Sequence, residues 1–296
     1  MYTENWSEAS ELADQVISSG DFTLETEFGN IWSMTNYNGR ESIFETQFQF
    51  SVQNPTIGNY FPTTAMSPAE SGWGYFTPTS DLENAFKEQG DSVRLNWTIM
   101  RHNFPVAGDP ANPKFDARPA SEKSARFNRK VYIPRAERTA GGRFSKDVIH
   151  LRLADVFLIK AEAAAMLMQS GPALAALTAV RDRVGLTTDR SLTDWTLIDA
   201  VRKERRLEMA LEGDRLYDLR RWKDQSGVPL INKVMGPNGT FVIYNTNQST
   251  DIYEKGNLNE AQNKGFSFVP GKHNLWPIPS KEIIASEGRI LQNPGY

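Results

Sequence analysis

The sequence predicts a mainly α-helical protein, in which a tetratricopeptide-like helical base carries long, loop-rich aromatic insertions and a few short strands. Two observations predict this fold class. After residue 145, apolar residues recur at the three- and four-residue spacing of one helix face. Residues 51–145 are instead rich in Pro, Gly, Asn and Ser, with one clear helical pattern at 79–89. So long a segment with many aromatic side chains is more typical of ordered functional loops than of a disordered linker.

The N-terminal part holds one clear helix and several shorter patterns. Apolar residues from Trp6 to Ile17 form a single stripe, which predicts a helix over residues 5–19 that stops at Gly20. A short helical turn is expected at 28–36. Strands are expected where apolar and polar residues partly alternate or β-formers gather, at 41–50, 93–100 and 130–133.

Helices dominate from residue 146 onward. An apolar stripe from Ile149 to Met168 ends at Ser170-Gly171-Pro172. Further helical patterns follow at 173–184, 193–211, 214–222 and 281–286. The first two helices and their Ser-Gly-Pro turn resemble a tetratricopeptide hairpin, whose usual repeat is about 34 residues.

The composition describes a soluble globular protein. Hydrophobic residues make up 39% of the chain, charged residues 23%, and the formal net charge is −3, which gives no long-range attraction to nucleic acid or to an anionic membrane. No apolar run approaches the roughly 18–20 residues of a membrane span. The lack of cysteine excludes disulfides and thiolate chemistry. The N-terminus shows no signal-peptide pattern and leads straight into a helix, so we expect the chain to begin inside a longer protein.

Residues 203–222 contain six basic and five acidic side chains among Leu, Met, Tyr and Trp. Side chains three and four positions apart are neighbours on a helix, so the spacing brings Arg205 within reach of Glu208. Acids four positions apart repel one another unless arginines separate them, and Arg152, Arg181 or Arg183 could do so from adjacent helices. We therefore predict a structural ion-pair lattice. Its predicted members are Glu204, Arg205, Glu208, Glu212, Arg215 and Asp218. The alternative is an anion-binding or catalytic carboxylate cluster.

The sequence gives little support for catalysis, metals or cofactors. Thirty-six acidic residues make carboxylate pairs inevitable, and no acid lies in an obviously apolar loop that would raise its pKa, so a glycosidase dyad is weakly supported. The three histidines lack metal-ligand spacing, and no nucleophile elbow, Walker loop or dinucleotide fingerprint is present. We therefore expect no catalytic residue, no metal and no cofactor.

The loop at 71–80, with the sequence SGWGYFTPTS, is the most suggestive binding candidate. Glycines on both sides of Trp73 let the backbone turn sharply and present the indole. Apolar sugar faces stack on Trp and Tyr, while neighbouring polar side chains bind hydroxyl groups. The candidate ligand contacts are Trp73, Tyr75, Phe76, Tyr60 and Asn59. The alternative is that Trp73 anchors the loop on the helical base.

Several phrases carry a family resemblance by their order and spacing. In the C-terminal half they are RLADVFLIKAEA at 152–163, AVRDRVG at 179–185, ERRLEMALEGDRLYDLRRW at 204–222, LWPIP at 275–279 and QNPGY at 292–296. Upstream, GWG at 72–74 and DSVR at 91–94 continue the series. The phrases resemble the SusD/RagB family of outer-membrane nutrient-binding proteins from Bacteroidetes, and the resemblance covers nearly the whole chain.

The resemblance implies a SusD-like α-α superhelix as a single domain over 1–296, with a loop-rich, ligand-facing part at 21–145 and a helical base and tail at 146–296. It also implies a non-catalytic protein that captures an oligosaccharide or another nutrient at the cell surface. The partner would be a SusC-like TonB-dependent outer-membrane transporter. Family members carry further helices and a lipidated cysteine upstream, so membrane attachment is expected only through a lipid anchor outside this sequence.

Two other functions stay open at this level. A helical scaffold that mainly binds a protein partner would use the aromatic loops at its interface, where aromatic residues are enriched. A glycoside hydrolase is the weaker alternative. The family has no fixed motif of aromatic ligand contacts, so the resemblance does not assign that role to Trp73, Tyr75 or Tyr60.

Overall fold

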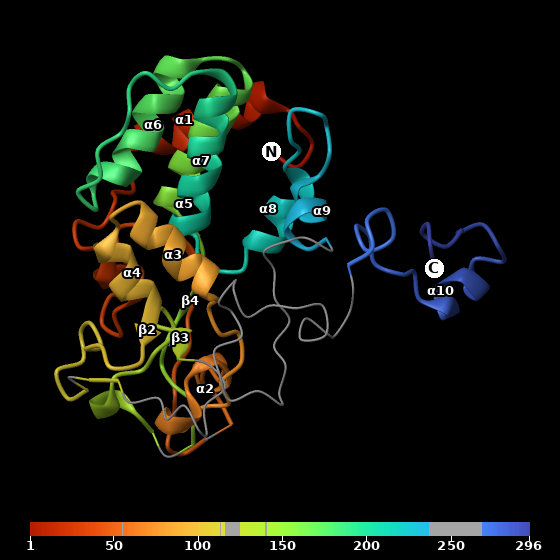
Figure 1. Ribbon diagram of the computed structural model, residues 1–296. Coiled ribbons are helices and arrows are strands. Elements are labelled where there is room, and N and C mark those ends of the chain that lie inside the picture. Colours follow the sequence, from red (N-terminus) through yellow and green to blue (C-terminus); the bar gives the residue numbers. More distant parts are fainter. Residues whose placement is uncertain (55, 113, 116–124, 140, 237–267) are drawn as a thin grey trace. The chain divides into compact units, whose positions relative to one another are not determined.

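The computed structural model describes residues 1–296 except 55, 113, 116–124, 140 and 237–267 (Figure 1). The chain divides into two compact units at Gly213, and the described part of the second unit is residues 214–236 and 268–296. No helix among the described residues is long and apolar enough to cross a membrane. The prediction of one domain over 1–296 stays a prediction.

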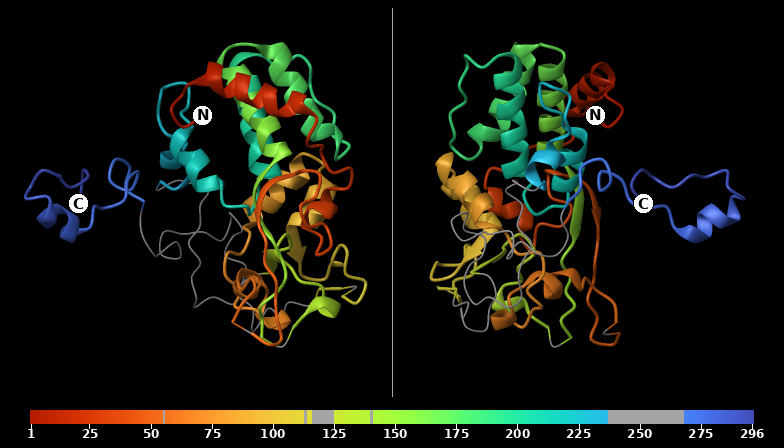
Figure 2. Two further views of the ribbon diagram at one scale, coloured as in Figure 1. Left: turned by 180° about the vertical axis from the view of Figure 1, so that it is seen from behind. Right: turned by 45° about the vertical axis from the view of Figure 1, so that its right-hand side comes forward.

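Four longer helices gather at one end of the first unit, as both views of Figure 2 show. They are α1 (Trp6–Ser19), α5 (Leu153–Met166), α6 (Ser170–Asp182) and α7 (Asp194–Glu208). Helix α5 packs against α1, α6 and α7, and its alanines allow close approach of the neighbouring backbones. Ala161, Leu177 and Val201 meet in the resulting core. The mainly helical fold class is thereby confirmed.

Short elements make up the rest of the first unit. They are η1 (Phe28–Trp32), β1 (Ser42–Thr46), α2 (Phe61–Ala65), η2 (Pro68–Glu70), α3 (Ser80–Glu88), α4 (Ser92–Thr98), β2 (Ile99–Arg101), β3 (Arg126–Asn128), η3 (Arg135–Glu137) and β4 (Val148–Arg152). Strand β1 pairs antiparallel with β4, and β2 with β3. A separate core of Met66, Phe115 and Phe127 lies under these loops, so they are packed rather than draped over the helices.

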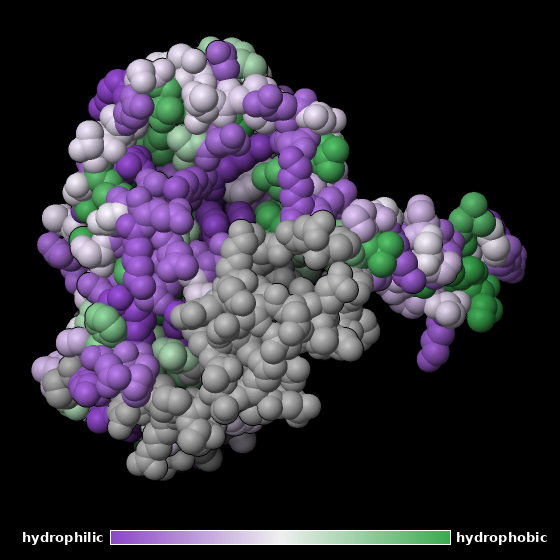
Figure 3. Space-filling view, in the orientation of Figure 1, coloured by the Kyte–Doolittle hydropathy of each residue, from purple (hydrophilic) through white to green (hydrophobic). Residues whose placement is uncertain are grey.

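Helix α3 shows why these short helices form where they do. Thr79 caps α3 by accepting a hydrogen bond from the Leu82 amide, and Leu82 and Phe86 lie on its buried face. The outer surface over α3 is mostly hydrophilic in Figure 3. The helix predicted at 79–89 therefore follows directly from its cap and its apolar stripe.

Three strand and helix assignments from the sequence were wrong. Residues 93–98 belong to α4 rather than to a strand, because Asp91 caps the helix by accepting from the Arg94 amide. The strand near 130 is β3, which ends before Lys130. The apolar stripe that starts at Ile149 begins as β4, because pairing with β1 holds 148–152 extended before α5 starts.

The second unit contains α8 (Arg215–Arg221), α9 (Leu230–Val234) and α10 (Ser280–Ala285). Leu219, Ile231 and Phe268 form its small apolar core. In the tail, the Gln292 side chain donates to the Ile278 carbonyl and accepts from its amide, at 2.9 and 2.7 Å. These two hydrogen bonds connect the segment 275–279 to the segment 292–296.

Candidate functional site

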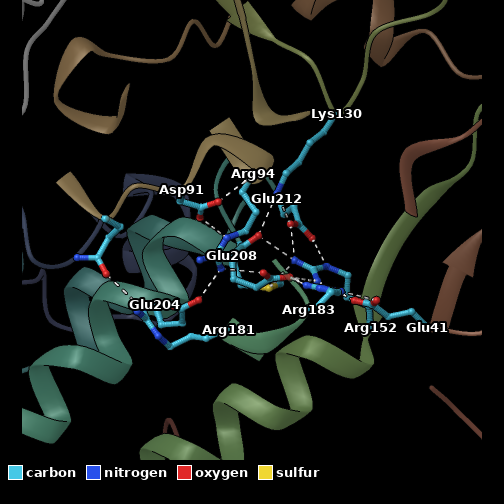
Figure 4. A network of polar contacts seen from close by, with 12 residues as sticks. Glu41, Asp91, Arg94, Lys130, Arg152, Arg181, Arg183, Glu204, Glu208 and Glu212 are labelled. Atoms are coloured by element: carbon cyan, nitrogen blue, oxygen red, sulfur yellow. Dashed lines mark hydrogen bonds and ion pairs between the residues drawn. The ribbon is translucent and has the colours of Figure 1, made fainter. Parts of the chain in front are cut away.

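The first candidate is a buried network of ion pairs centred on Glu208 of α7 (Figure 4). Its carboxylate receives Arg94 of α4 at 2.9 Å and Arg152, at the end of β4, at 2.6 Å. Arg183, just after α6, also pairs with it. Burial by itself raises the pKa of Glu208, but these three arginines hold that pKa well below its usual range. The carboxylate is therefore ionised and cannot serve as a general acid.

The network continues on both sides of Glu208. Arg152 also binds Glu41 at 2.9 Å and Glu212 at 2.8 Å, and Lys130 donates to Glu212 at 2.6 Å. On the other side, Glu204 receives Arg94 at 2.6 Å and Arg181 at 2.7 Å. Each acid is thus separated from the next by a cation that comes from another element of the fold. The geometry joins α4, β4, α6 and α7, which is a structural role.

The predicted lattice residues fall into two groups. Glu204, Glu208 and Glu212 lie in the network, whereas Arg205 pairs with Asp155 of α5. Asp218 lies in the second unit and binds Arg221 at 2.7 Å. Arg215, also in that unit, lies over the Trp222 ring at 5.7 Å. Sequence spacing found the acids, but their partners were set by tertiary packing. Arg94 was missed as a partner, although it stands in the DSVR phrase.

The second candidate is an exposed cluster of five rings, Tyr60, Phe61, Trp73, Tyr75 and Phe76, called here the aromatic cluster. Trp73 lies between Tyr60 and Tyr75, with ring centroids 5.5 and 5.7 Å away. Phe76 extends the series to Tyr75 at 6.3 Å and to Phe61 at 5.6 Å. These spacings are typical of edge-to-face aromatic contacts. Trp73, Tyr75 and Phe76 nevertheless remain 51%, 55% and 64% exposed.

The backbone holds the aromatic cluster in place. The Trp73 and Tyr75 amides donate to the carbonyls of Thr63 and Thr64, both at 2.9 Å, which ties the loop to α2. A Cβ on Gly72 would lie 2.1 Å from the Met66 carbonyl oxygen, so only glycine allows this close approach. The rings are therefore presented by a tightly fixed loop and do not depend on burial for their position.

Phe76 shows local backbone strain. Its φ of 58° lies in the left-handed region, which is unfavourable for a bulky aromatic residue. Such strain is often kept at functional sites, because the surrounding structure imposes it for a purpose other than stability. A strained residue whose ring is mostly exposed is consistent with ligand contact.

Asn59, which the sequence suggested as a ligand contact, lies beneath the aromatic cluster. It is 5% exposed, and its side chain donates to the Lys146 carbonyl at 2.8 Å and accepts from the Phe61 amide at 2.9 Å. Both ends of the amide are thus used to hold the start of α2. We therefore assign Asn59 to the framework of the site and not to its ligand-facing surface.

A cavity of about 80 Å³ is lined in part by Phe61 and Pro62. It is lined in part by Lys130 and Lys146, both buried. The Lys146 ammonium donates to the Trp32 carbonyl at 2.6 Å, and burial lowers its pKa to about 7. The volume suits a few water molecules rather than a sugar.

The segment that supplies the five rings, residues 56–79, contains a single carboxylate. Glu70 is the single charged residue in 56–79. It is buried and bound by Arg135 and Arg138, both at 2.6 Å, and although burial raises its pKa, these two arginines bring the net pKa below the usual value. In the part of the chain that the structure describes, no three His, Asp or Glu side chains are close enough together to hold a metal.

Comparison with known proteins identifies the family of this chain. The sequence model of the SusD family matches residues 40–296. A SusD-like protein P2 from Formosa agariphila is 24% identical over 320 residues, which cover 99% of this chain and 56% of the relative.

Solved structures show the same fold. A SusD-like protein from Bacteroides fragilis superposes with a TM-score of 0.73 at 21% identity, covering all of this chain and 63% of the other. Surface glycan-binding protein A from Bacteroides uniformis superposes with a TM-score of 0.70 at 23% identity, and the match covers 99% of this chain and 58% of the other. Surface glycan-binding protein A from Bacteroides thetaiotaomicron, in complex with laminarihexaose, superposes with a TM-score of 0.68 at 20% identity, and the match covers 99% of this chain and 61% of the other. The chain thus spans little more than half the length of these relatives.

Proposed function

The chain belongs to the SusD family, and we propose that it is part of a non-catalytic cell-surface protein that captures an oligosaccharide or another nutrient. The longer protein would be held at the outer membrane by a lipid anchor and would deliver the ligand to a SusC-like TonB-dependent transporter. The observation that carries the proposal is the aromatic cluster, whose rings are fixed by the backbone and left open to solvent.

The physical basis is the stacking of apolar sugar faces on exposed rings. A ring that is half-exposed in the free protein loses that surface to a bound sugar, and burying an aromatic side chain completely is worth about 1.5–3 kcal/mol. Neighbouring rings in one fixed loop bind several sugar units at once, with little ordering cost. The structural relatives include surface glycan-binding proteins, one of them in complex with laminarihexaose, which supports this assignment.

A binding role fits the charges better than hydrolysis does. The acid in the loop of the aromatic cluster, Glu70, is enclosed by two arginines, and Glu208 is held ionised by three. Neither can give a proton to a glycosidic oxygen at neutral pH. Release of reducing sugars by the pure protein, abolished by one carboxylate substitution, would contradict the non-catalytic assignment.

The test is titration calorimetry against a panel of polysaccharides with the wild type and two alanine variants. Trp73→Ala is expected to weaken binding about 10- to 100-fold, since it removes the central ring. Tyr217→Ala is the matched control, because Tyr217 is 55% exposed, against 51% for Trp73, and belongs to α8 of the second unit rather than to the aromatic cluster. Equal loss in both variants, or none in Trp73→Ala, would remove the aromatic cluster from the site. Binding of the transporter alone, with no glycan bound, would favour a protein-binding scaffold.

A further inference from the structure

We propose that the aromatic cluster selects polysaccharides that carry anionic groups, carboxylate or sulfate, and that Arg143 makes this selection. The inference rests on the proposed glycan-binding function and goes beyond it by naming the ligand class. The guanidinium of Arg143 lies 5.0 Å from the centroid of the Tyr60 ring, which itself contacts Trp73. The aromatic cluster therefore has a fixed positive charge at its edge.

Arg143 differs from the other arginines near this loop. Arg135 and Arg138 both form ion pairs with Glu70. Arg143 instead donates a long hydrogen bond of 3.3 Å from Nη1 to the Gly58 carbonyl, and within the described residues it forms no ion pair with a carboxylate. Its positive charge is therefore available to a ligand.

The surrounding charges favour an anion. Residues 56–79, which supply all five rings, carry one charged side chain, and Glu70 is neutralised by its two arginines. Three arginines, Arg135, Arg138 and Arg143, thus contact a segment that carries one carboxylate, although the whole chain has a net charge of −3. The charge of these contacting groups is opposite in sign to the net charge of the chain.

The geometry suits an acidic sugar. A pyranose that stacks on an aromatic ring presents its equatorial substituents at its rim, parallel to the ring surface. A carboxylate or sulfate at that rim would reach a guanidinium at the edge of the aromatic cluster while the sugar face lies on Trp73. Arginine offers a planar fork of donors that matches both groups, and stacking on Tyr60 restricts the side chain before the ligand arrives.

Affinity gel electrophoresis with matched polysaccharide pairs tests the inference. The first pair is polygalacturonate and its fully methyl-esterified form, and the second is a sulfated galactan and its desulfated form. The wild type is expected to be retarded by at least one anionic member and about tenfold less by its neutral counterpart. The difference should shrink as sodium chloride rises, because salt screens exposed charges.

Variants then assign the selection to one side chain. Arg143→Gln should abolish the preference for the anionic member, Arg143→Lys should keep part of it, and Trp73→Ala should weaken retention by every polysaccharide that binds. Arg190→Gln is the matched control, because it removes an exposed charge in the connection between α6 and α7.

The outcomes separate this inference from the proposed function. Retardation by neutral members alone, or a preference unchanged in Arg143→Gln, would overturn the selection of anions and leave glycan binding intact. Lack of retardation by every polysaccharide would overturn glycan binding and this inference with it. The comparison of wild type on each pair needs no variant, so it holds even where a substitution impairs folding.

Discussion

The ion-pair network and the aromatic cluster use their side chains in opposite ways. Around Glu208 the glutamates are each met by a cation from another element, and Arg94 and Arg152 are almost completely buried. Around Trp73 the backbone carries the structural contacts, and the rings keep about half their surface in solvent. A buried network serves the fold, because its members pair with one another and lie out of reach of a ligand. The exposed rings remain accessible to a ligand, because backbone hydrogen bonds rather than burial hold them in place.

The largest test of this contrast is to break the network at its most connected cation. Arg152→Met leaves Glu41, Glu208 and Glu212 short of a partner in a buried site, so we expect a loss of about 3–5 kcal/mol in the free energy of unfolding. Urea denaturation followed by circular dichroism measures it. Lys203→Met is the control, since its 3.9 Å pair with Glu88 is exposed and is worth about 0–1 kcal/mol.

A small difference between those two variants would show that the network adds little to the fold. Where Arg152→Met yields no folded protein, Glu41→Gln gives a milder test. It keeps the shape of the side chain and removes one charge that Arg152 and Arg183 share.

The second test disturbs the aromatic cluster without touching a ring. Gly72→Ala would place a Cβ 2.1 Å from the Met66 carbonyl oxygen, so the loop must shift. We expect a stability loss of about 1–3 kcal/mol and a loss of glycan affinity close to that of Trp73→Ala. Gly171→Ala is the matched control, because its added Cβ lies in open space on α6. Wild-type affinity in Gly72→Ala would show that the rings do not need this loop geometry.

The two regions also differ in how far the sequence predicts them. Acids four apart in a charge-dense helix require cations from elsewhere, so the lattice around Glu208 could be expected from spacing alone. The helix at 92–98 was missed although its Asp91 cap is local, because the Arg94 pairs that hold the helix in place depend on α7. The sequence suggested Asn59 as a ligand contact because its neighbours in the chain give no sign that it is buried. Its burial depends on contacts with residues 144 and 146, which are far away in the sequence.

The third test concerns the cavity that Phe61 and Lys146 help to line. Burial lowers the pKa of Lys146 from 10.5 to about 7, so between these values the unfolded chain holds a proton that the folded chain has largely released. Stability therefore rises with pH, by about 1 kcal/mol between pH 7 and 8. Lys146→Met should remove this gain. Lys130 contributes mainly at higher pH, since its pKa is about 8.

Urea denaturation at pH 7, 7.5 and 8 measures the slope, with Lys203→Met again as the control for loss of one positive charge. A slope that is the same in Lys146→Met as in the wild type would assign the pH dependence to other groups. Glycan affinity should be unchanged in Lys146→Met, because the ammonium is buried and bound to the Trp32 carbonyl.

The smallest effect on stability is expected at Phe76. Phe76→Gly loses the contacts with Tyr75 and Phe61 but relieves the positive φ, so the two changes offset and stability should stay within about 0.5 kcal/mol of wild type. Glycan affinity should fall about three- to tenfold, because the most exposed ring of the aromatic cluster is gone. Thermal unfolding and calorimetry on the same samples measure both quantities. A large loss of stability with unchanged affinity would place Phe76 with the structural residues, and the strain at this position would then lack a functional reason.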